Sequence, residues 1–337
     1  MTKIYKLIFG TILMMSTIIS ISAYSWLGMW IGLEMNLLSI IPIIINKNIL
    51  SSESSVKYFI TQALASTFIL MSIIMLMWKT NFPSNMIFNY PFIMIMNSSL
   101  LLKMGMAPFH FWFPEVLEGM NWFNCTIMLT WQKIAPMMLM MYNSKSTLFY
   151  SIIIILGMII SVSMSFNQVS LRKLMAFSSI NHMGWMMASM LLEKMIWLIY
   201  FIVYTLITIA VTFTIKNIFF INQLFMINES NQTKFMFIMN FLSLSGIPPF
   251  LGFLPKWLTI QMMIESNLIT LSLIMIVLTL IMIFVYMKIS MSTLLLKINQ
   301  SNWKIMFNNK PSSKFTSLVN FLSISSLIAM TILLNSI

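Results

Sequence analysis

Four charged side chains interrupt long apolar stretches of this sequence. They are Glu34, Lys103, Lys133 and Lys256. A charge at the centre of a membrane helix costs about 2.5–3.5 kcal/mol on insertion scales. Because of that cost, such residues usually face the interior of a helix bundle and mark an ion or proton path. The four residues are therefore candidates for proton transfer inside a membrane.

The chemistry of these groups favours a proton relay. A lysine has an unperturbed pKa of about 10.4, and burial and a neighbouring carboxylate shift that value in opposite directions. Glu34 can then switch a buried lysine between holding and releasing its proton, and water can bridge a row of such lysines. His182 can join the relay because imidazole titrates near neutral pH. His110 is a weaker candidate.

Most of these residues also allow an interpretation without transport. Glu34 and one lysine could form a static buried ion pair. Lys103 could extend to the membrane interface because its helix ends nearby, and Lys256 could be interfacial if the helix before it ends early. Lys133 reaches an interface less easily, since apolar residues flank it on both sides. His182 could be a hydrogen-bonded core histidine.

Apolar stretches of about 20 residues, the length that spans a bilayer, recur along the chain. The first could be a signal peptide, but a transmembrane helix is favoured because further spans continue to the C-terminus. The sequence predicts an all-α polytopic membrane protein with about eleven transmembrane helices in a single domain over residues 1–337. The expected helices are 4–21, 25–46, 56–78, 88–107, 123–142, 147–165, 174–191, 195–219, 235–251, 267–288 and 315–336.

Composition excludes several classes of protein. Hydrophobic residues make up 59% of the chain and charged residues 8%, whereas a soluble domain has about 25% charged residues. A soluble enzyme, a DNA-binding protein and a disordered scaffold are therefore excluded. Cys125 is the one cysteine, which excludes an internal disulfide or a thiolate-bound cluster. No dinucleotide-binding glycine motif occurs, so we expect this chain to bind no cofactor and no metal.

Two of the expected helices run into similar proline-rich strings. Residues 108–114 (PFHFWFP) and 249–255 (PFLGFLP) share the same spacing between prolines. Proline removes a backbone donor and clashes with the preceding turn, so we predict broken helices near 88–119 and 235–264. An odd number of helices separates the two copies, which favours an antiporter-like inverted repeat, although chance resemblance is the alternative. Glu115 and Glu118 follow the first break and are expected at the surface.

The cations are distributed unevenly between the two sides of this topology. With the N-terminus inside, thirteen of the 19 Lys and Arg residues fall on the inner side, three on the outer side and three within or beside the broken apolar stretches. The positive-inside rule supports this orientation. The inner set is Lys3, Lys6, Lys47, Lys57, Arg172, Lys173, Lys216, Lys234, Lys288, Lys297, Lys304, Lys310 and Lys314, and the outer set is Lys79, Lys145 and Lys194.

One pairing follows from these assignments. We predict that Glu34 and Lys103 lie within ion-pair or one-water reach, which requires the helices 25–46 and 88–107 to pack together. Gly28 and Gly32 form a small-xxx-small face that would permit this close approach.

The motifs as a set resemble the antiporter-like membrane subunits of mitochondrial NADH:ubiquinone oxidoreductase, respiratory complex I, which are related to Mrp-type sodium/proton antiporters. The resemblance covers nearly the whole chain, and the eleven expected helices resemble the shortened form of the subunit that animals have. It rests on residues 26–36, 102–114, 130–136, 170–184 and 246–257. It implies that the family's glutamate–lysine pair maps onto Glu34 and Lys103, its central lysine onto Lys133 and its distal lysine onto Lys256.

The resemblance also implies a function and partners. The chain would be a proton-translocating subunit of NADH:ubiquinone reductase that carries no redox centre itself. It would be an insect-like protein of the mitochondrial inner membrane. Its N-terminus would lie in the matrix and its C-terminus in the intermembrane space. NADH, FMN, Fe–S clusters and ubiquinone would belong to other subunits. The expected partners are other membrane-arm subunits, notably the antiporter-like subunit 4 and the small subunit 4L, and phospholipids including cardiolipin, but no nucleic acid. The alternatives are a stand-alone cation/proton antiporter and a static membrane spacer.

Overall fold

The computed structural model describes residues 2–46, 48–80, 90–144, 146–215, 218–221, 223 and 231–295. This part of the chain is helical, apart from an isolated bridge between Ser170 and Phe220, as the sequence predicts. Within it, six helices are long and apolar enough to cross a membrane. The chain divides into two compact units, Met1–Ser146 and Thr147–Ile337. The predicted helix 315–336 and seven lysines of the topology count (Lys47, Lys145, Lys216, Lys297, Lys304, Lys310 and Lys314) lie outside the described residues.

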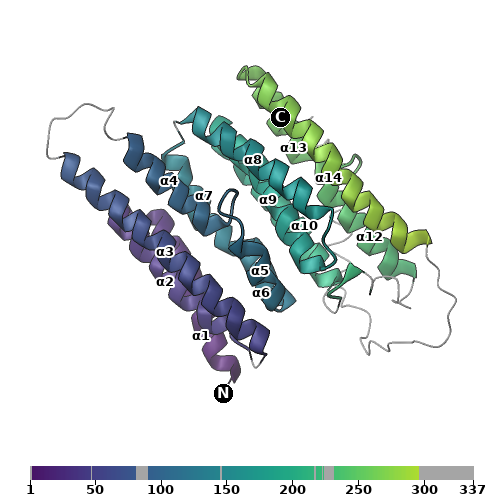
Figure 1. Cartoon of the computed structure of the whole chain (residues 1–337), viewed down its shortest axis with the longest axis horizontal. Helices are drawn as coiled ribbons and strands as arrows, with labels where there is room; N and C mark the ends of the chain where they lie inside the picture. The colour runs from purple at the N-terminus through teal and green to yellow at the C-terminus, as the bar shows by residue number, and fades with distance from the viewer. Residues whose placement is uncertain are drawn as a thin grey trace, which may run out of the picture. The chain divides into compact units, whose positions relative to one another are not determined.

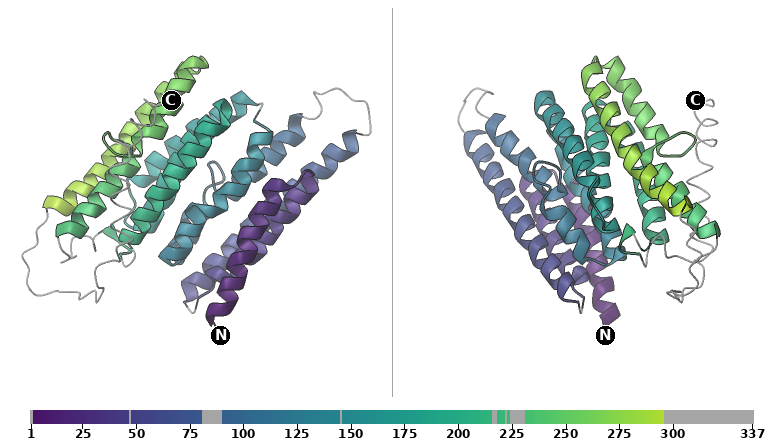
Figure 2. Two further views of the ribbon diagram at one scale, coloured as in Figure 1. Left: turned by 180° about the vertical axis from the view of Figure 1, so that it is seen from behind. Right: turned by 45° about the vertical axis from the view of Figure 1, so that its right-hand side comes forward.

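The first unit is built around the long helix α3. Its helices α1, α2 and α3 pack side by side, and α3 also contacts α4 and α5 (Figures 1 and 2). Helix α7 packs against α4 and α1. In chain order the elements are α1 (Thr2–Ser22), α2 (Trp26–Ile44), α3 (Ile49–Thr80), α4 (Tyr90–Met104), α5 (Trp112–Gly119), α6 (Trp122–Leu129), the 3₁₀ turn η2 (Trp131–Lys133) and α7 (Ile134–Tyr142).

The second unit surrounds one almost entirely buried helix, α9, which contacts α8, α10 and α13. Helix α14 packs on α8, α12 and α13, and α10 also contacts α12 and α13. Because other helices pack around α9, its polar residues lie inside the unit and not on a solvent-exposed face. The elements are α8 (Thr147–Ser165), α9 (Leu171–Leu192), α10 (Lys194–Thr214), α12 (Asn231–Ser245), α13 (Phe253–Glu265) and α14 (Ile269–Leu295).

Both predicted breaks are present, and each begins at a glycine. Gly105 and Gly246 follow the last residues of α4 and α12 and have positive φ angles of 72° and 76°. At the first break the amide of Gly105 donates to Leu102 and that of Met106 donates to Leu101, the two bonds of a Schellman motif. The two helices therefore end earlier than predicted, because glycine adopts the left-handed conformation before the prolines are reached.

The two breaks have the same backbone design. Helices α4 and α12 are both 15 residues long, and α5 and α13 begin at the same interval after the two glycines. The amide of Phe109 donates to Met106 at 2.9 Å, and the amide of Phe250 donates to Ile247 at 3.0 Å. The likeness between the two proline-rich strings is therefore structural as well as sequential.

The predicted helix 123–142 is wrong in one respect, because it is divided by η2. Pro136 has no amide hydrogen, so the Gln132 carbonyl cannot accept the helical bond that residue 136 would normally donate. The Thr130 hydroxyl donates to the Thr126 carbonyl at 2.7 Å, a contact that often bends helices. A third break therefore lies next to Lys133.

The predicted use of the glycine face is also wrong. A Cβ at Gly32 would lie 2.7 Å from the backbone nitrogen of Ser20, so Gly32 allows α1, not α4, to approach α2. Gly28 is near Ala23 and Ser25 in the connection from α1. The short loop between α1 and α2 makes them antiparallel neighbours, and α2 then packs on α3.

Candidate functional site

Lys103 lies inside the first unit, in the last turn of α4, with 7% of its surface exposed. It lines a small polar cavity together with Leu33, Asn36, Leu37, Tyr58, Gln62, Gln132 and Pro136. The cavity is about the size of one water molecule. The structure therefore places Lys103 beside polar groups within the helix bundle.

Glu34 and Lys103 are the two residues that the sequence predicts within ion-pair or one-water reach. Glu34 is partly buried on α2. No ion pair within 4.0 Å joins these two described side chains. A direct ion pair is therefore not formed, and the predicted alternative of one-water reach stays a prediction.

Lys133 ends the turn η2 and is almost completely buried, with 1% of its surface exposed. Its Nζ lies 5.6 Å from the centre of the Phe113 ring, within the range of a cation–π contact. Phe113 belongs to α5, immediately after the first break, and a Cβ on Gly105 would lie 2.8 Å from its Cβ. Lys133 therefore packs against the helix that follows this break.

Uncharged polar residues that the sequence analysis did not single out connect these elements. Asn36 and Gln132 exchange two side-chain hydrogen bonds, and the Tyr58 hydroxyl is 3.5 Å from Gln132 Oε1. Gln62 donates to the backbone carbonyl of Lys103 at 3.3 Å. Their positions in the sequence could have indicated these residues, since Asn36 is two residues from Glu34 and Gln132 directly precedes Lys133.

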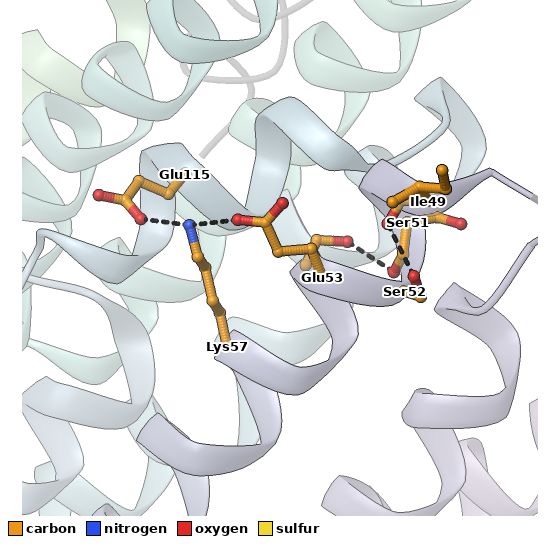
Figure 3. A network of polar contacts seen from close by, with 7 residues as sticks. Ile49, Ser51, Ser52, Glu53, Lys57 and Glu115 are labelled. Atoms are coloured by element: carbon orange, nitrogen blue, oxygen red, sulfur yellow. Dashed lines mark hydrogen bonds and ion pairs between the residues drawn. The ribbon is translucent and has the colours of Figure 1, made fainter.

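His110 and Glu115 take different positions near the first break. His110 is 3% exposed, and its Nδ1 is 3.3 Å from the Pro108 carbonyl. Glu115 is exposed, as predicted, and its carboxylate and that of Glu53 both lie 2.9 Å from the Lys57 ammonium (Figure 3). The Lys57–Glu115 pair thus links α3 to α5 at the surface, whereas the Glu53–Lys57 pair lies within α3. Glu118 is partly buried.

His182 lies inside the second unit on α9, with 4% of its surface exposed. Its Nδ1 is 2.9 Å from the Tyr200 hydroxyl, and its ring centre lies 5.2 Å from that of Tyr204. Both tyrosines come from α10 and are themselves buried. His182 is therefore a hydrogen-bonded interior histidine, and this geometry is compatible with either interpretation of its role.

Lys256 is held at the second break. It is 8% exposed, and its Nζ donates at 2.8 Å to the carbonyl of Ser245, the last residue of α12. A cation at this position satisfies a free carbonyl and complements the negative end of the helix dipole. Lys256 is therefore interior, and its position depends on Gly246, because a Cβ there would lie 2.9 Å from Nζ.

The first unit thus brings Lys103 together with a polar cavity and places Glu34 and Lys133 on elements that adjoin it. The second unit contains His182 and Lys256 on α9 and α13, which pack on each other. Among the described residues, no group of three or more His, Cys, Asp or Glu could hold a metal ion. The polar neighbours of Lys103 and His182 are amide and hydroxyl side chains.

Comparisons with known proteins agree with this arrangement. Residues 23–283 match the family model described as NADH:quinone oxidoreductase/Mrp antiporter, TM. A chain of respiratory complex I from Thermus thermophilus with bound aureothin superposes with a TM-score of 0.84 at 19% identity, over 97% of this chain and 77% of that one. A chain of the Mrp complex from Dietzia sp. gives a TM-score of 0.74 at 14% identity, over 82% and 58%. The fold is that of antiporter-like membrane subunits.

A curated relative narrows the assignment. The chain is 46% identical over 340 residues to NADH-ubiquinone oxidoreductase chain 2 of Anopheles gambiae, with 99% of each chain covered. The chain therefore belongs to the NADH-ubiquinone oxidoreductase chain 2 family, the antiporter-like multi-pass subunits of respiratory complex I.

Proposed function

We propose that this chain translocates protons across the mitochondrial inner membrane through a buried Lys/Glu axis, driven by electron transfer from NADH to ubiquinone elsewhere in the complex. The observation that carries the proposal is the placement of two buried lysines at two helix breaks of one unit. Lys103 precedes the first break and faces a polar cavity, and Lys133 ends η2. Buried lysines change protonation state readily, and irregular backbone at membrane depth is tolerated where it lines a wet cavity.

In this proposal Glu34 modulates Lys103, and Lys133 receives or passes on the proton. His182 and Lys256 serve the same function in the second unit, and His110 has a weaker claim because its ring lies at the break itself. The cavity that Lys103 shares with the α2 residues on either side of Glu34, Leu33 and Asn36, supports the first step. The contact of Lys256 with the end of α12 supports a switchable position for its ammonium.

We further propose that residues 1–337 form one transmembrane domain with an antiporter-like inverted repeat, in which the two broken helices are corresponding elements. The matched backbone of the two breaks supports this proposal, since inverted repeats commonly place broken helices at the site of transport. The distribution of cations supports an N-terminus in the matrix and a C-terminus in the intermembrane space.

The proposed partners follow from the family. The chain would contact other membrane-arm subunits, notably the antiporter-like subunit 4 and the small subunit 4L, and phospholipids including cardiolipin. NADH, FMN, Fe–S clusters and ubiquinone would bind other subunits. This chain would contribute proton movement and no redox chemistry.

A second candidate is cation/proton exchange by the chain alone, which the structural likeness to an Mrp complex favours. It predicts exchange activity for the isolated chain in proteoliposomes. Coupling within complex I predicts no exchange by the isolated chain.

The test of the proposed function is Lys133→Met in the assembled complex, because methionine keeps about the length of the side chain and removes the amino group that carries the proton. We expect fewer protons pumped per NADH oxidised. The control is Lys57→Met, which removes an exposed lysine on the surface of the same unit. Unchanged pumping in Lys133→Met would refute the proposal and support the static spacer.

A further inference from the structure

A reciprocal pair of amide side chains joins α2 to the turn that carries Lys133. Asn36 Nδ2 donates to Gln132 Oε1 at 3.0 Å, and Gln132 Nε2 donates to Asn36 Oδ1 at 2.9 Å. The two residues are 4% and 9% exposed and 96 positions apart in the chain. Each amide therefore satisfies one donor and the acceptor oxygen of the other inside the bundle.

The backbone alone does not fix this turn. Pro136 removes the donor that would continue a helix through Gln132, and the amide of Lys133 bonds to the Thr130 carbonyl at 3.3 Å in a 3₁₀ pattern. Short 3₁₀ segments have poorer hydrogen-bond geometry than an α-helix. Contacts from elsewhere in the fold must therefore hold the turn, and the Asn36–Gln132 pair supplies two of them.

The pair also lies where it can affect the candidate proton path. Gln132 is the residue before Lys133, and both amides line the cavity that Lys103 lines. Because the side chain of Gln132 is fixed to α2, a change at Asn36 would rotate or release the turn that carries the Lys133 side chain. It would also expose two unpaired polar atoms to the Lys103 cavity.

We propose that the Asn36–Gln132 pair is a positioning device, which holds η2 against α2 and thereby fixes the Lys133 ammonium over the Phe113 ring. The effect on pumping rests on the function proposed above, whereas the position of the turn does not. Asn36 and Gln132 are positioning residues, since they act through Lys133.

The experiment uses Asn36→Leu, Gln132→Met and the double variant in the assembled complex. Each single variant leaves one buried amide without its partner, which is the costly case. The double variant replaces both partners by apolar groups of similar size, which can be nearly neutral for stability. The matched control is Asn124→Leu, which removes another buried amide that links the same region to α2, through a 3.1 Å bond to the Ile43 carbonyl.

We expect all three variants to show the loss of protons per NADH that Lys133→Met shows, with η2 displaced in their cryo-EM structures. Asn124→Leu should keep the wild-type ratio and an unmoved turn. If the single variants fail to assemble, the double variant gives the result by the same criteria. A wild-type ratio and an unmoved turn in any of the three would overturn the proposal, because packing alone would then position Lys133.

The two proposals fail in different ways. Normal pumping in Lys133→Met together with a displaced turn in Gln132→Met would refute the proposed function and leave the positioning role intact. Loss of pumping in Lys133→Met with an unmoved turn in Gln132→Met would refute the positioning role alone.

Discussion

Replacing Tyr200 by phenylalanine removes one oxygen atom from the contact that orients His182. The Tyr200 side chain is 1% exposed, and its hydroxyl lies 2.9 Å from His182 Nδ1. The phenylalanine ring would still fill the space between α9 and α10, so the fold should tolerate the change. What is lost is the bond that selects the orientation and tautomer of the imidazole.

The size of this effect follows from the burial of both residues. Removing one partner of a buried hydrogen bond costs about 1–3 kcal/mol, because the remaining polar group is left without that bond and without water. A bias of about 1–3 kcal/mol corresponds to about a 5- to 150-fold change in an equilibrium. The population of the orientation of His182 that Tyr200 holds would fall by that factor relative to the other orientations.

The assay compares protons pumped per NADH in complexes that carry Tyr200→Phe or the control Tyr150→Phe. Tyr150 is also buried in the second unit, but its hydroxyl has no hydrogen-bond partner among the described residues. We expect a lower ratio for Tyr200→Phe and a wild-type ratio for Tyr150→Phe, with both complexes assembled. Equal ratios in the two variants would refute the reasoning, and His182 would then be an ordinary core histidine.

Two further substitutions test the second break and the surface of the first unit. Gly246→Ala should lower the stability of the complex by about 1–2 kcal/mol, because alanine is disfavoured at a φ of 76°. The added Cβ should also displace the Lys256 ammonium. An unchanged melting temperature would contradict this expectation. Lys57→Met should change stability only slightly, because both of its ion pairs, with Glu53 and Glu115, are exposed. Any loss should shrink in high salt, since salt screens exposed charges. A large loss of stability that salt does not reduce would contradict this expectation.

The sequence predicts the features that local chemistry decides. Prolines at fixed spacing locate the two breaks, and lysines within apolar stretches indicate burial, as observed for Lys103, Lys133 and Lys256. The helix 147–165 agrees residue for residue with α8. These features depend on backbone donors, side-chain volume and charge, all of which are properties of a single segment.

The features that the sequence does not predict depend on contacts between distant segments. Asn36 and Gln132 are uncharged, so neither stands out until the fold brings them together. Tyr200 is one aromatic residue among many in an apolar helix. Gly32 correctly indicates a close helix contact but not which helix makes it, and α1 occupies that position because it is the sequence neighbour.

The two breaks show how one backbone design can place lysines in different roles. At the first break the indole of Trp112 donates to the Leu102 carbonyl at 3.1 Å, and Lys103 lines the polar cavity. At the second break Lys256 itself donates to the last carbonyl of α12. A hydrogen bond from a charged donor is stronger than one between neutral groups. Proton loss from Lys256 would therefore weaken the bond that holds it at the helix end, whereas proton loss from Lys103 would leave the Trp112–Leu102 bond in place.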